Sequence, residues 1–302
     1  MGNYAGSFSR NFEVYSTDSV PYIDADGQLQ HQAAEEYTST STPNGDWWFV
    51  TGETTISGRI GISGTKHLIL CDGATLTLPK GIHLTNGNTL YIYGQSAGTG
   101  KLIINGVASQ QAGIGGNSYE QCGTLIVNGG ELEVTGSTYS AGIGGGYNNN
   151  SGTVSLNWKN PTDRIYASSY NSSVTLGGQF MLEGTDTQAT TGNIGGKTLV
   201  PALTVKFDSN GGSGTMSDVL KGASMDYELS ECGFTAPADK EFDCWEIGGT
   251  QYNAGGTAGG GVHVRRMVQG SRVHERVGFR RGCNVGCYAL CEVDGGRLHD
   301  RV

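Results

Sequence analysis

The chain has 302 residues, of which 51 are glycine and only 6 are proline, and 16% are charged. This composition excludes a collagen-like or proline-rich protein and predicts many turns with positive φ or closely stacked backbone. The net charge of −9 is unevenly spread: residues 259–302 carry eight arginines and four acids, so residues 1–258 carry 11 basic against 24 acidic groups. Such an acidic body does not attract nucleic acid or an anionic membrane, and without a run of about 18 apolar residues we expect no membrane insertion.

Residues 1–45 form a polar, weakly patterned lead-in, and its first part lacks the basic start and apolar core of a signal peptide. Within it, Asp24-Ala-Asp26-Gly27 has two interpretations. It could begin a calcium-binding loop, but the third acid and the distal glutamate of that loop are missing. We therefore favour a hairpin turn closed by the Asp-Gly pair.

Short strands are expected from Trp47 onward, because β-branched and aromatic runs are separated by glycine or asparagine at short, regular intervals. Regular short strands without helical periodicity predict an all-β chain. Trp47 and Trp48 begin this region. We favour a role in covering the exposed first end of a stack of strands, and the alternative is a surface platform for a ligand.

The motif Ala112-Gly-Ile-Gly-Gly116 returns 29 residues later as Ala141-Gly-Ile-Gly-Gly145, and a weaker copy is Gly192-Asn-Ile-Gly-Gly196. The unit between the first two copies consists of three short predicted strands separated by glycine turns. A repeat of this kind is typical of one turn of a parallel β-helix, whose turns stack at roughly 4.8 Å. We therefore predict a right-handed parallel β-helix, or β-solenoid, over residues 46–200.

The composition changes at Pro201 and again near residue 259. Residues 201–258 are interpreted as a separate small module with one strand, a glycine-rich turn, a short helical piece at Met216–Leu220 and two strands anchored by aromatic residues. Residues 259–302 contain arginine but no lysine and show no strand or helix period. They are either a basic tail that binds a partner or, as we favour, a disordered or non-native end.

The seven cysteines do not form a metal-ligand pattern. Four of them lie in apolar or aromatic surroundings and are expected to be buried free thiols: Cys71, Cys122, Cys232 and Cys244. Cys283, Cys287 and Cys291 have a spacing that matches neither a zinc ribbon nor an iron–sulfur motif. His67 and His83 lie in separate predicted strands, where packing or surface roles are expected. We therefore predict no metal and no cofactor.

Two parts of the chain resemble known families. Asp72-Gly-Ala-Thr-Leu-Thr77, Asn88–Leu102 and the paired Ala-Gly-Ile-Gly-Gly motifs are similar to the β-solenoid repeats of a class of gut-bacterial surface proteins, over roughly residues 46–200. Val205-x-Phe-Asp-x-Asn-Gly-Gly-x-Gly-x-Met216, with Phe242-x-x-Trp245, resembles the Listeria–Bacteroides repeat, a small β-grasp-like module of bacterial cell-surface proteins.

The resemblance implies an extracellular or cell-wall protein that acts in adhesion or as a spacer, with glycans or host and cell-wall surface components as partners. Neither family brings catalytic residues. The repeat family closes with a Thr/Val-rich strand after the turn at Tyr252–Gly255, where this chain has its Arg-rich end, so the β-grasp-like module is expected to be incomplete. Together with the absent signal peptide, this favours a fragment of a longer protein, and its oligomeric state is left open.

Four tyrosines lie beside the predicted turns and are the candidates for ligand binding: Tyr119, Tyr139, Tyr147 and Tyr166. Aromatic rings on a polar surface can stack on sugars, because each ring has an apolar face and a polar end. The simpler interpretation is a set of scattered solvent-facing side chains.

Glu131 and Glu133 are the candidate acid pair for an alternative function, a polysaccharide lyase or glycosidase on a β-helix scaffold. They alternate with Leu132 and Val134, so both carboxylates should point outward and both apolar side chains inward. Their separation along the strand is roughly 6.7 Å, which overlaps the carboxylate separations of glycosidases. The simpler interpretation is a solvated outer face, because no third group converges on them locally. We therefore favour a non-enzymatic surface protein without catalytic residues.

Overall fold

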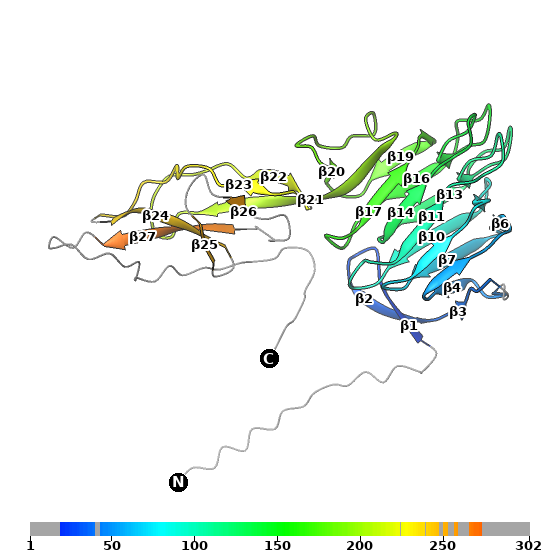
Figure 1. The fold of residues 1–302 in the computed structure, drawn as a ribbon, viewed down its shortest axis with the longest axis horizontal. Helices are drawn as coiled ribbons and strands as arrows, with labels where there is room; N and C mark the ends of the chain where they lie inside the picture. The colour runs from blue at the N-terminus through cyan, green and yellow to red at the C-terminus, as the bar shows by residue number, and fades with distance from the viewer. Residues whose placement is uncertain are drawn as a thin grey trace, which may run out of the picture.

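The computed structural model describes residues 19–39, 43–223, 225–238, 240–247, 250–252, 257–258 and 266–273, and the regular elements of this part of the chain are all strands. Most of them lie in three sheets in which most neighbouring strands run parallel. The prediction of an all-β chain with parallel sheets is confirmed for these residues. Figure 1 shows these strands side by side, from β4 in blue to β19 in green.

Neighbouring parallel strands in these sheets are three strands apart in the sequence from β4 onward. The first sheet contains β3 (Glu35–Glu36), β4 (Trp47–Val50), β7 (Thr65–Leu70), β10 (Thr89–Gly94), β13 (Thr124–Val127), β16 (Thr153–Leu156) and β19 (Ser173–Leu176). The first, parallel part of the second contains β5 (Glu53–Thr55), β8 (Thr75–Thr77), β11 (Lys101–Ile104), β14 (Glu131–Val134) and β17 (Arg164–Ala167). The third contains β6 (Ile60–Gly61), β9 (Ile82–His83), β12 (Ile114–Gly115), β15 (Ile143–Gly144) and β18 (Tyr170–Asn171). We call these three sheets together the stack.

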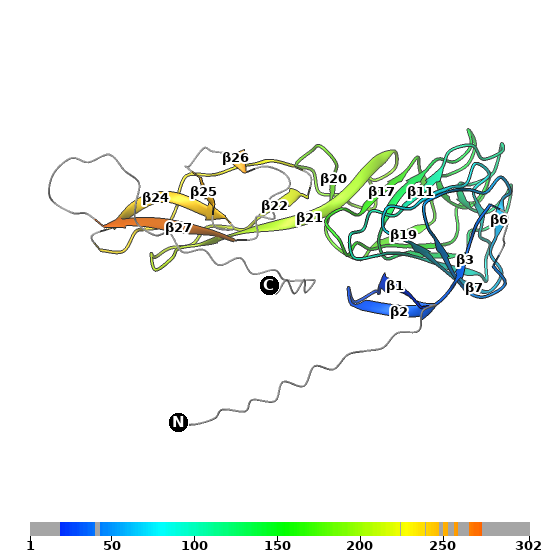
Figure 2. The ribbon, with the colours of Figure 1, turned by 60° about the horizontal axis from the view of Figure 1, so that its bottom comes forward.

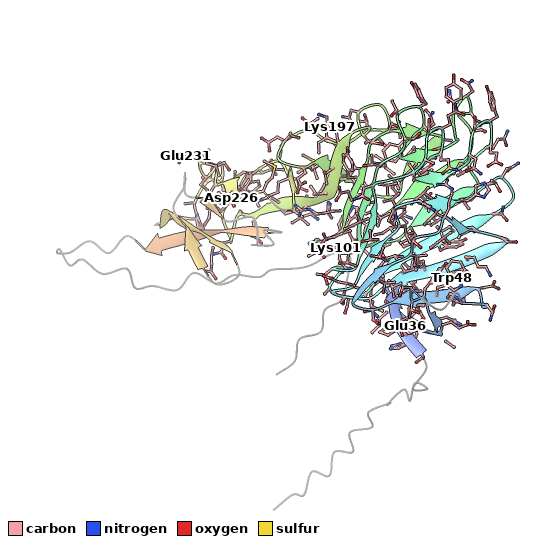
Figure 3. All side chains as sticks on the ribbon, turned by 45° about the vertical axis from the view of Figure 1, so that its right-hand side comes forward. Glu36, Trp48, Lys101, Lys197, Asp226 and Glu231 are labelled. Atoms are coloured by element: carbon pink, nitrogen blue, oxygen red, sulfur yellow. The ribbon has the colours of Figure 1, made fainter. Side chains whose placement is uncertain are left out.

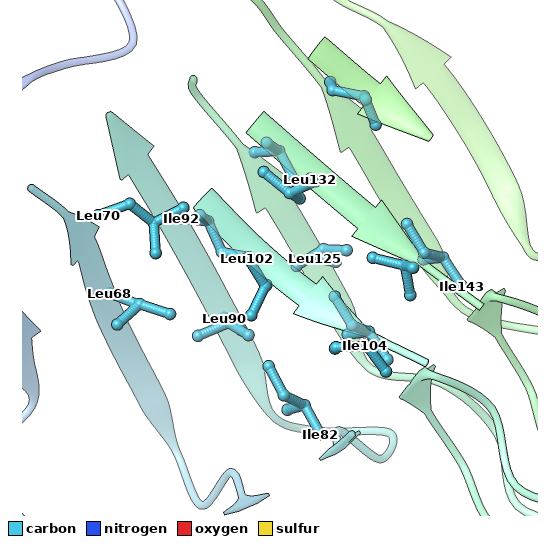
Figure 4. Packing of buried hydrophobic residues seen from close by; sticks show 14 of the residues in the cluster. Leu68, Leu70, Ile82, Leu90, Ile92, Leu102, Ile104, Leu125, Leu132 and Ile143 are labelled. Atoms are coloured by element: carbon cyan, nitrogen blue, oxygen red, sulfur yellow. The ribbon is translucent and has the colours of Figure 1, made fainter. Parts of the chain in front are cut away.

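Apolar side chains fill the space between the sheets and repeat at the same register in successive strands. Two buried columns run through the second and third sheets: Leu76, Leu102, Leu132 and Ile165, and Ile60, Ile82, Ile114 and Ile143. Figure 4 shows part of this core. Each fully buried side chain of this size contributes roughly 1.5–3 kcal/mol, so a continuous apolar column holds the stack together.

The repeated Ala-Gly-Ile-Gly-Gly motif forms β12 and β15, where the third sheet is most closely packed. Gly115 has φ of 143°, and a Cβ atom added to it would lie 1.8 Å from the carbonyl oxygen of Gly144. Only glycine fits a backbone that approaches its neighbour so closely. The weaker copy at residues 192–196 forms a turn region rather than a strand, although Ile194 is buried.

A buried carboxylate fastens the loop between β16 and β17 to the turn before β14. Asp163 accepts hydrogen bonds from the backbone N–H groups of Gly130 (2.7 Å), Lys159 (2.7 Å) and Asn160 (2.8 Å). Burial raises the pKa of Asp163 to about 6, and these three backbone groups oppose the increase. The side chain thus satisfies three backbone donors at once in a place that is closed to water.

A long strand that pairs with the end of the stack continues without interruption into the second module. β21 (Lys197–Asp208) pairs antiparallel with β17 and β20 (Phe180–Leu182) through its first half and with β22 (Val219–Gly222) through its second half. The boundary expected between residues 200 and 201 therefore falls inside one strand (Figure 1). The helical piece expected at Met216–Leu220 is absent, since residues 219–222 form β22.

The second module has its own apolar centre, formed by Val205, Leu229 and Trp245. The indole Nε1–H of Trp245 donates to the carbonyl oxygen of Ser230 at 2.8 Å. The remaining strands of the module are β23 (Tyr227–Glu228), β24 (Lys240–Ile247), β25 (Thr250–Tyr252), β26 (Thr257–Ala258) and β27 (Arg266–Val273). β24 pairs antiparallel with β25 and with β27, and β23 pairs with β26.

β27 lies within residues 259–302, where the composition predicts no regular structure. Residues 266–273 differ from that expectation because β21 pairs with them in parallel and β24 pairs with them antiparallel. Backbone hydrogen bonds to a neighbour on each side hold residues 266–273 as a strand. Such pairing depends on residues distant in the sequence, so the composition of the segment does not predict it. The rest of this segment, including Cys283, Cys287 and Cys291, lies outside the described residues.

Residues 19–33 of the lead-in form a hairpin, β1 (Ser19–Ile23) and β2 (Leu29–Ala33), which Figure 2 shows on the outside of the stack. Asp24 Oδ1 accepts hydrogen bonds from the backbone N–H groups of Asp26 (2.9 Å) and Gln28 (2.8 Å), and Gly27 has φ of 77°. The turn interpretation of this segment is confirmed, because the carboxylate is used by the turn itself.

Three of the expected free thiols can be placed. Cys71 and Cys122 are buried and free, as predicted, and burial raises the pKa of Cys71 to about 11 and that of Cys122 to about 12. Cys232 is free and half-buried. The side chain of Cys244 lies outside the described residues. None of the three is poised as a thiolate near neutral pH.

The close approach at β12 predicts a large loss of stability for Gly115→Ala. The added methyl group would clash with the backbone of Gly144, and alanine would be strained at this φ. We expect the free energy of unfolding, measured by urea denaturation, to fall by at least about 2 kcal/mol.

The matched control is Gly61→Ala. Gly61 occupies the same column of the third sheet at its open end, through its register with His83, and nothing lies within 4 Å of an added Cβ. This variant should unfold within about 0.5 kcal/mol of the parent. Equal losses for the two variants would contradict the packing argument.

Candidate functional site

Three of the four candidate tyrosines come together on the loops that join the repeats. Tyr119 follows β12, Tyr139 precedes β15 and Tyr147 follows it. The ring of Tyr147 packs edge-on against both others, with centroid distances of 6.0 Å to Tyr119 and 6.1 Å to Tyr139. Tyr119 is 69% exposed and Tyr139 is 63% exposed, so both rings face solvent. We call these three residues the tyrosine cluster.

The backbone of two stacked loops sets the geometry of the tyrosine cluster. The N–H of Tyr119 donates to the carbonyl oxygen of Tyr147 at 2.8 Å. Tyr119 and Asn148 both have positive φ, 62° and 59°, a conformation that persists only where surrounding contacts enforce it. Position 146 must also be glycine, because an added Cβ would lie 1.7 Å from the carbonyl oxygen of Asn117. The loops therefore hold the backbone that carries the three rings in a fixed arrangement.

Tyr166, the fourth candidate, lies elsewhere. It is on β17 in the second sheet, where its register partners are Glu133 on β14 and Thr198 on β21. Tyr166 and the acid pair line one groove of about 390 Å³ on the outer face of this sheet. We call it the acidic groove. Its lining residues are Glu131, Leu132, Glu133, Thr135, Arg164, Tyr166, Glu183 and Thr198.

The acid pair takes the predicted orientation. Leu132 and Val134 are buried, whereas Glu133 is exposed and Glu131 is partly exposed. The third group that the local sequence does not supply comes from other strands, because Arg164 is the register partner of Glu131 and forms an ion pair with Glu183. The sequence places Arg164 beside the acid pair only once the register of β14 and β17 is known.

The tryptophans at the first end of the stack have separate roles. Trp48 is buried and packs edge-on against Tyr37 of the lead-in, with a centroid distance of 5.4 Å. Trp47 lies on the outer face of the first sheet, stacked on His67 at 3.9 Å, and Tyr22 of the hairpin lies 5.1 Å away. The rings of His67 and Tyr22 already cover the ring of Trp47, which argues against a role for Trp47 as a surface on which a ligand stacks.

Trp47 begins a row of aromatic rings along the first sheet. Trp47, His67 and Tyr91 are register partners in β4, β7 and β10, and the rings of His67 and Tyr91 stack at 4.7 Å. His67 Nδ1 also lies 3.0 Å from the hydroxyl of Tyr93. Burial lowers the pKa of His67, and the nearby Asp46 opposes this. Its role is packing, as the sequence predicts.

His83 belongs to a polar group on the third sheet. Its Nε2 atom lies 2.7 Å from Glu120 Oε2, which also accepts the backbone N–H of Asn117 at 2.9 Å. The hydrogen bond to His83 and that backbone contact lower the pKa of Glu120. Arg59 beside them donates to the carbonyl oxygens of Lys80, Ala112 and Gly115, which belong to two separate segments of the chain, so it joins the turn before β9 to the segment that contains β12. Across the described ranges, no group of three or more His, Cys, Asp or Glu side chains could hold a metal ion.

Comparison with protein-family models found no matching family, and comparisons with curated proteins and with solved structures found no similar protein. In the part of the chain that the structure describes, no helix is long and apolar enough to cross a membrane.

The environment of His67 predicts a pH dependence of stability. Its folded pKa lies below the unfolded value of about 6.5, so the unfolded state binds more protons between these two values. The stabilisation from neutral His67 is complete above about pH 6.5 and is lost as the pH falls toward the folded pKa.

His67→Phe removes this titration and keeps an aromatic ring in the row. Urea denaturation at several pH values between about 7.5 and 5 should show a smaller loss of stability for the variant than for the parent. The other ionisable groups are common to both proteins and cancel in the difference. A loss that is equal or larger in His67→Phe would contradict this account of the aromatic row.

Proposed function

We propose that this protein is a non-enzymatic, extracellular or cell-surface bacterial protein that acts in adhesion or as a spacer and contacts glycans through the tyrosine cluster. The observation that carries the proposal is the close grouping of Tyr119, Tyr139 and Tyr147, two of them largely exposed. Large exposed aromatic side chains gathered at one place on a polar surface favour a binding role over scattered solvent exposure.

The physical basis is the match between aromatic faces and sugar rings. A sugar presents C–H groups on one face and hydroxyl groups at its edges, and a tyrosine ring meets the first while its hydroxyl can hydrogen-bond with the second. Because contacts between the loops already fix the backbone that carries the three rings, a ligand has only their side-chain freedom to restrict when it binds. Loops held by a rigid scaffold are common places for binding sites.

The scaffold is inferred to be a right-handed parallel β-solenoid. Neighbouring strands in each sheet are three strands apart in the sequence from β4 onward, so the chain visits the three sheets in rotation. The low charge content and the resemblance to gut-bacterial surface repeats and to the Listeria–Bacteroides repeat support an extracellular or cell-wall location. An elongated stack followed by a second module suits a spacer that holds a binding surface away from its attachment point.

A second candidate function is a carbohydrate-active enzyme, and the acidic groove is the observation that favours it. The groove brings Glu131 and Glu133 together with Arg164, Tyr166 and Glu183. However, Glu131 is ion-paired with Lys101 at 3.0 Å and Glu183 is ion-paired with Arg164. Carboxylates that neutralise neighbouring cations are poorly suited to general acid catalysis, so binding is preferred over cleavage.

The tyrosine cluster is tested by glycan-array screening of the full chain, followed by calorimetric titration with the best neutral glycan. Tyr119→Ala and Tyr139→Ala should each weaken binding by about fivefold or more, which corresponds to about 1 kcal/mol per lost aromatic contact. Both residues are exposed, so thermal unfolding should change little.

Tyr166→Ala is the matched control, since it removes the same side chain from another face of the stack. It should leave the affinity for the neutral glycan unchanged. If the array shows no binding, or if the three variants weaken binding equally, the assignment of glycan contact to the tyrosine cluster is wrong.

The enzymatic alternative is tested by incubating the protein with a panel of neutral and acidic polysaccharides and measuring new reducing ends and unsaturated products. We expect no cleavage. An activity that both Glu131→Gln and Glu133→Gln abolish, while Glu53→Gln on the same sheet retains it, would establish the enzyme and overturn the non-enzymatic proposal.

A further inference from the structure

Two rows of outward side chains cross the acidic groove, and they differ in charge balance. The first row follows the register Lys101, Glu131 and Arg164 and ends at Glu183. Lys101, labelled in Figure 3, pairs with Glu131, and Arg164 pairs with Glu183. Two cations and two carboxylates therefore neutralise one another along this row.

The second row follows the register Ile103, Glu133, Tyr166 and Thr198. Glu133 is its only charged residue, and it lies between an apolar side chain on β11 and an aromatic one on β17. Within the described part of the chain, Glu133 forms no ion pair. The groove thus carries one uncompensated carboxylate beside a tyrosine ring.

A carboxylate next to an aromatic ring is a suitable environment for an organic cation. The carboxylate accepts charge-assisted hydrogen bonds from an ammonium group, and the ring face attracts the same positive charge. The groove volume of about 390 Å³ falls within the range of ligand pockets, roughly 300–1,000 Å³, and suits a short stretch of a sugar chain.

We propose that the acidic groove binds a glycan that carries a free amino group, with the protonated amine held by Glu133 beside Tyr166. This inference rests on the proposed function, because it takes the ligand to be a glycan. It adds a second site, on a different face from the tyrosine cluster, and it names an amino sugar as the class of ligand. Acidic sugars are excluded, because Glu133 would repel their carboxylates.

The experiment is calorimetric titration of the full chain with two oligosaccharides that differ only in the amine. One is the β-1,4-linked tetramer of glucosamine and the other is the same tetramer with every amine acetylated. At low salt and a pH that keeps the amines protonated, the glucosamine tetramer should bind at least about tenfold more tightly, because one charge-assisted contact separates the two ligands. Raising the salt concentration should weaken this preference.

Substitutions at Glu133 test whether this residue causes the preference for the glucosamine tetramer. Glu133→Gln keeps the size of the side chain and should weaken glucosamine-tetramer binding by about tenfold or more, whereas the acetylated tetramer should be unaffected. Glu133→Asp should retain part of the preference. Glu53→Gln is the control, since Glu53 is an exposed glutamate on β5 of the same sheet, outside the groove. It should bind like the parent.

The outcomes separate this inference from the proposed function. Equal affinity for the two tetramers, an unchanged affinity in Glu133→Gln, or equal losses in Glu133→Gln and Glu53→Gln would each overturn the inference. If the two tetramers bind equally and the acetylated tetramer loses affinity in Tyr119→Ala, glycan contact at the tyrosine cluster stands while the amine site fails. If neither tetramer binds and the array is also empty, both proposals fail.

Discussion

The structure depends on one constraint, the close and regular stacking of backbone from one turn of the chain to the next. Neighbouring parallel strands lie roughly 4.8 Å apart, so every residue stands directly beside its register partner. At Gly115 and Gly144 the approach leaves no room for a side chain, and the motif around them must be glycine. The same spacing places the leucine-rich and isoleucine columns on the inside and the tyrosine-bearing loops on the outside.

Stacking also explains how the surface acquires its chemistry. Side chains in one register form rows: rings of Trp47, His67 and Tyr91 on the first sheet, and alternating charges on the second. A row whose side chains stack on one another or form ion pairs with one another stabilises the fold. We propose that ligands bind where a row is left incomplete, as at Glu133, or where loops carry rings out of the stack, as at Tyr119 and Tyr139.

The sequence predicted what local pattern controls and missed what register controls. Alternation at residues 131–134 correctly predicted which side chains are buried, and the Ala-Gly-Ile-Gly-Gly pair correctly predicted a strand and glycine turns in successive units. Register partners in the first sheet, from Thr65 to Ser173, are 24, 35, 29 and 20 residues apart, so no fixed period aligns the strands. Arg164 and Glu183 therefore could not be placed beside Glu131, and the antiparallel return of β21 was equally invisible.

The central claim is that a fixed cluster of tyrosines on a stacked scaffold receives a sugar. The most direct measurement is NMR of the protein with isotope-labelled tyrosine rings, titrated with the glycan that binds best. The account predicts that the ring signals of Tyr119, Tyr139 and Tyr147 shift together, while those of Tyr91 and Tyr93 in the aromatic row do not. Shifts confined to rings outside the cluster, or none at all on saturation, would contradict it.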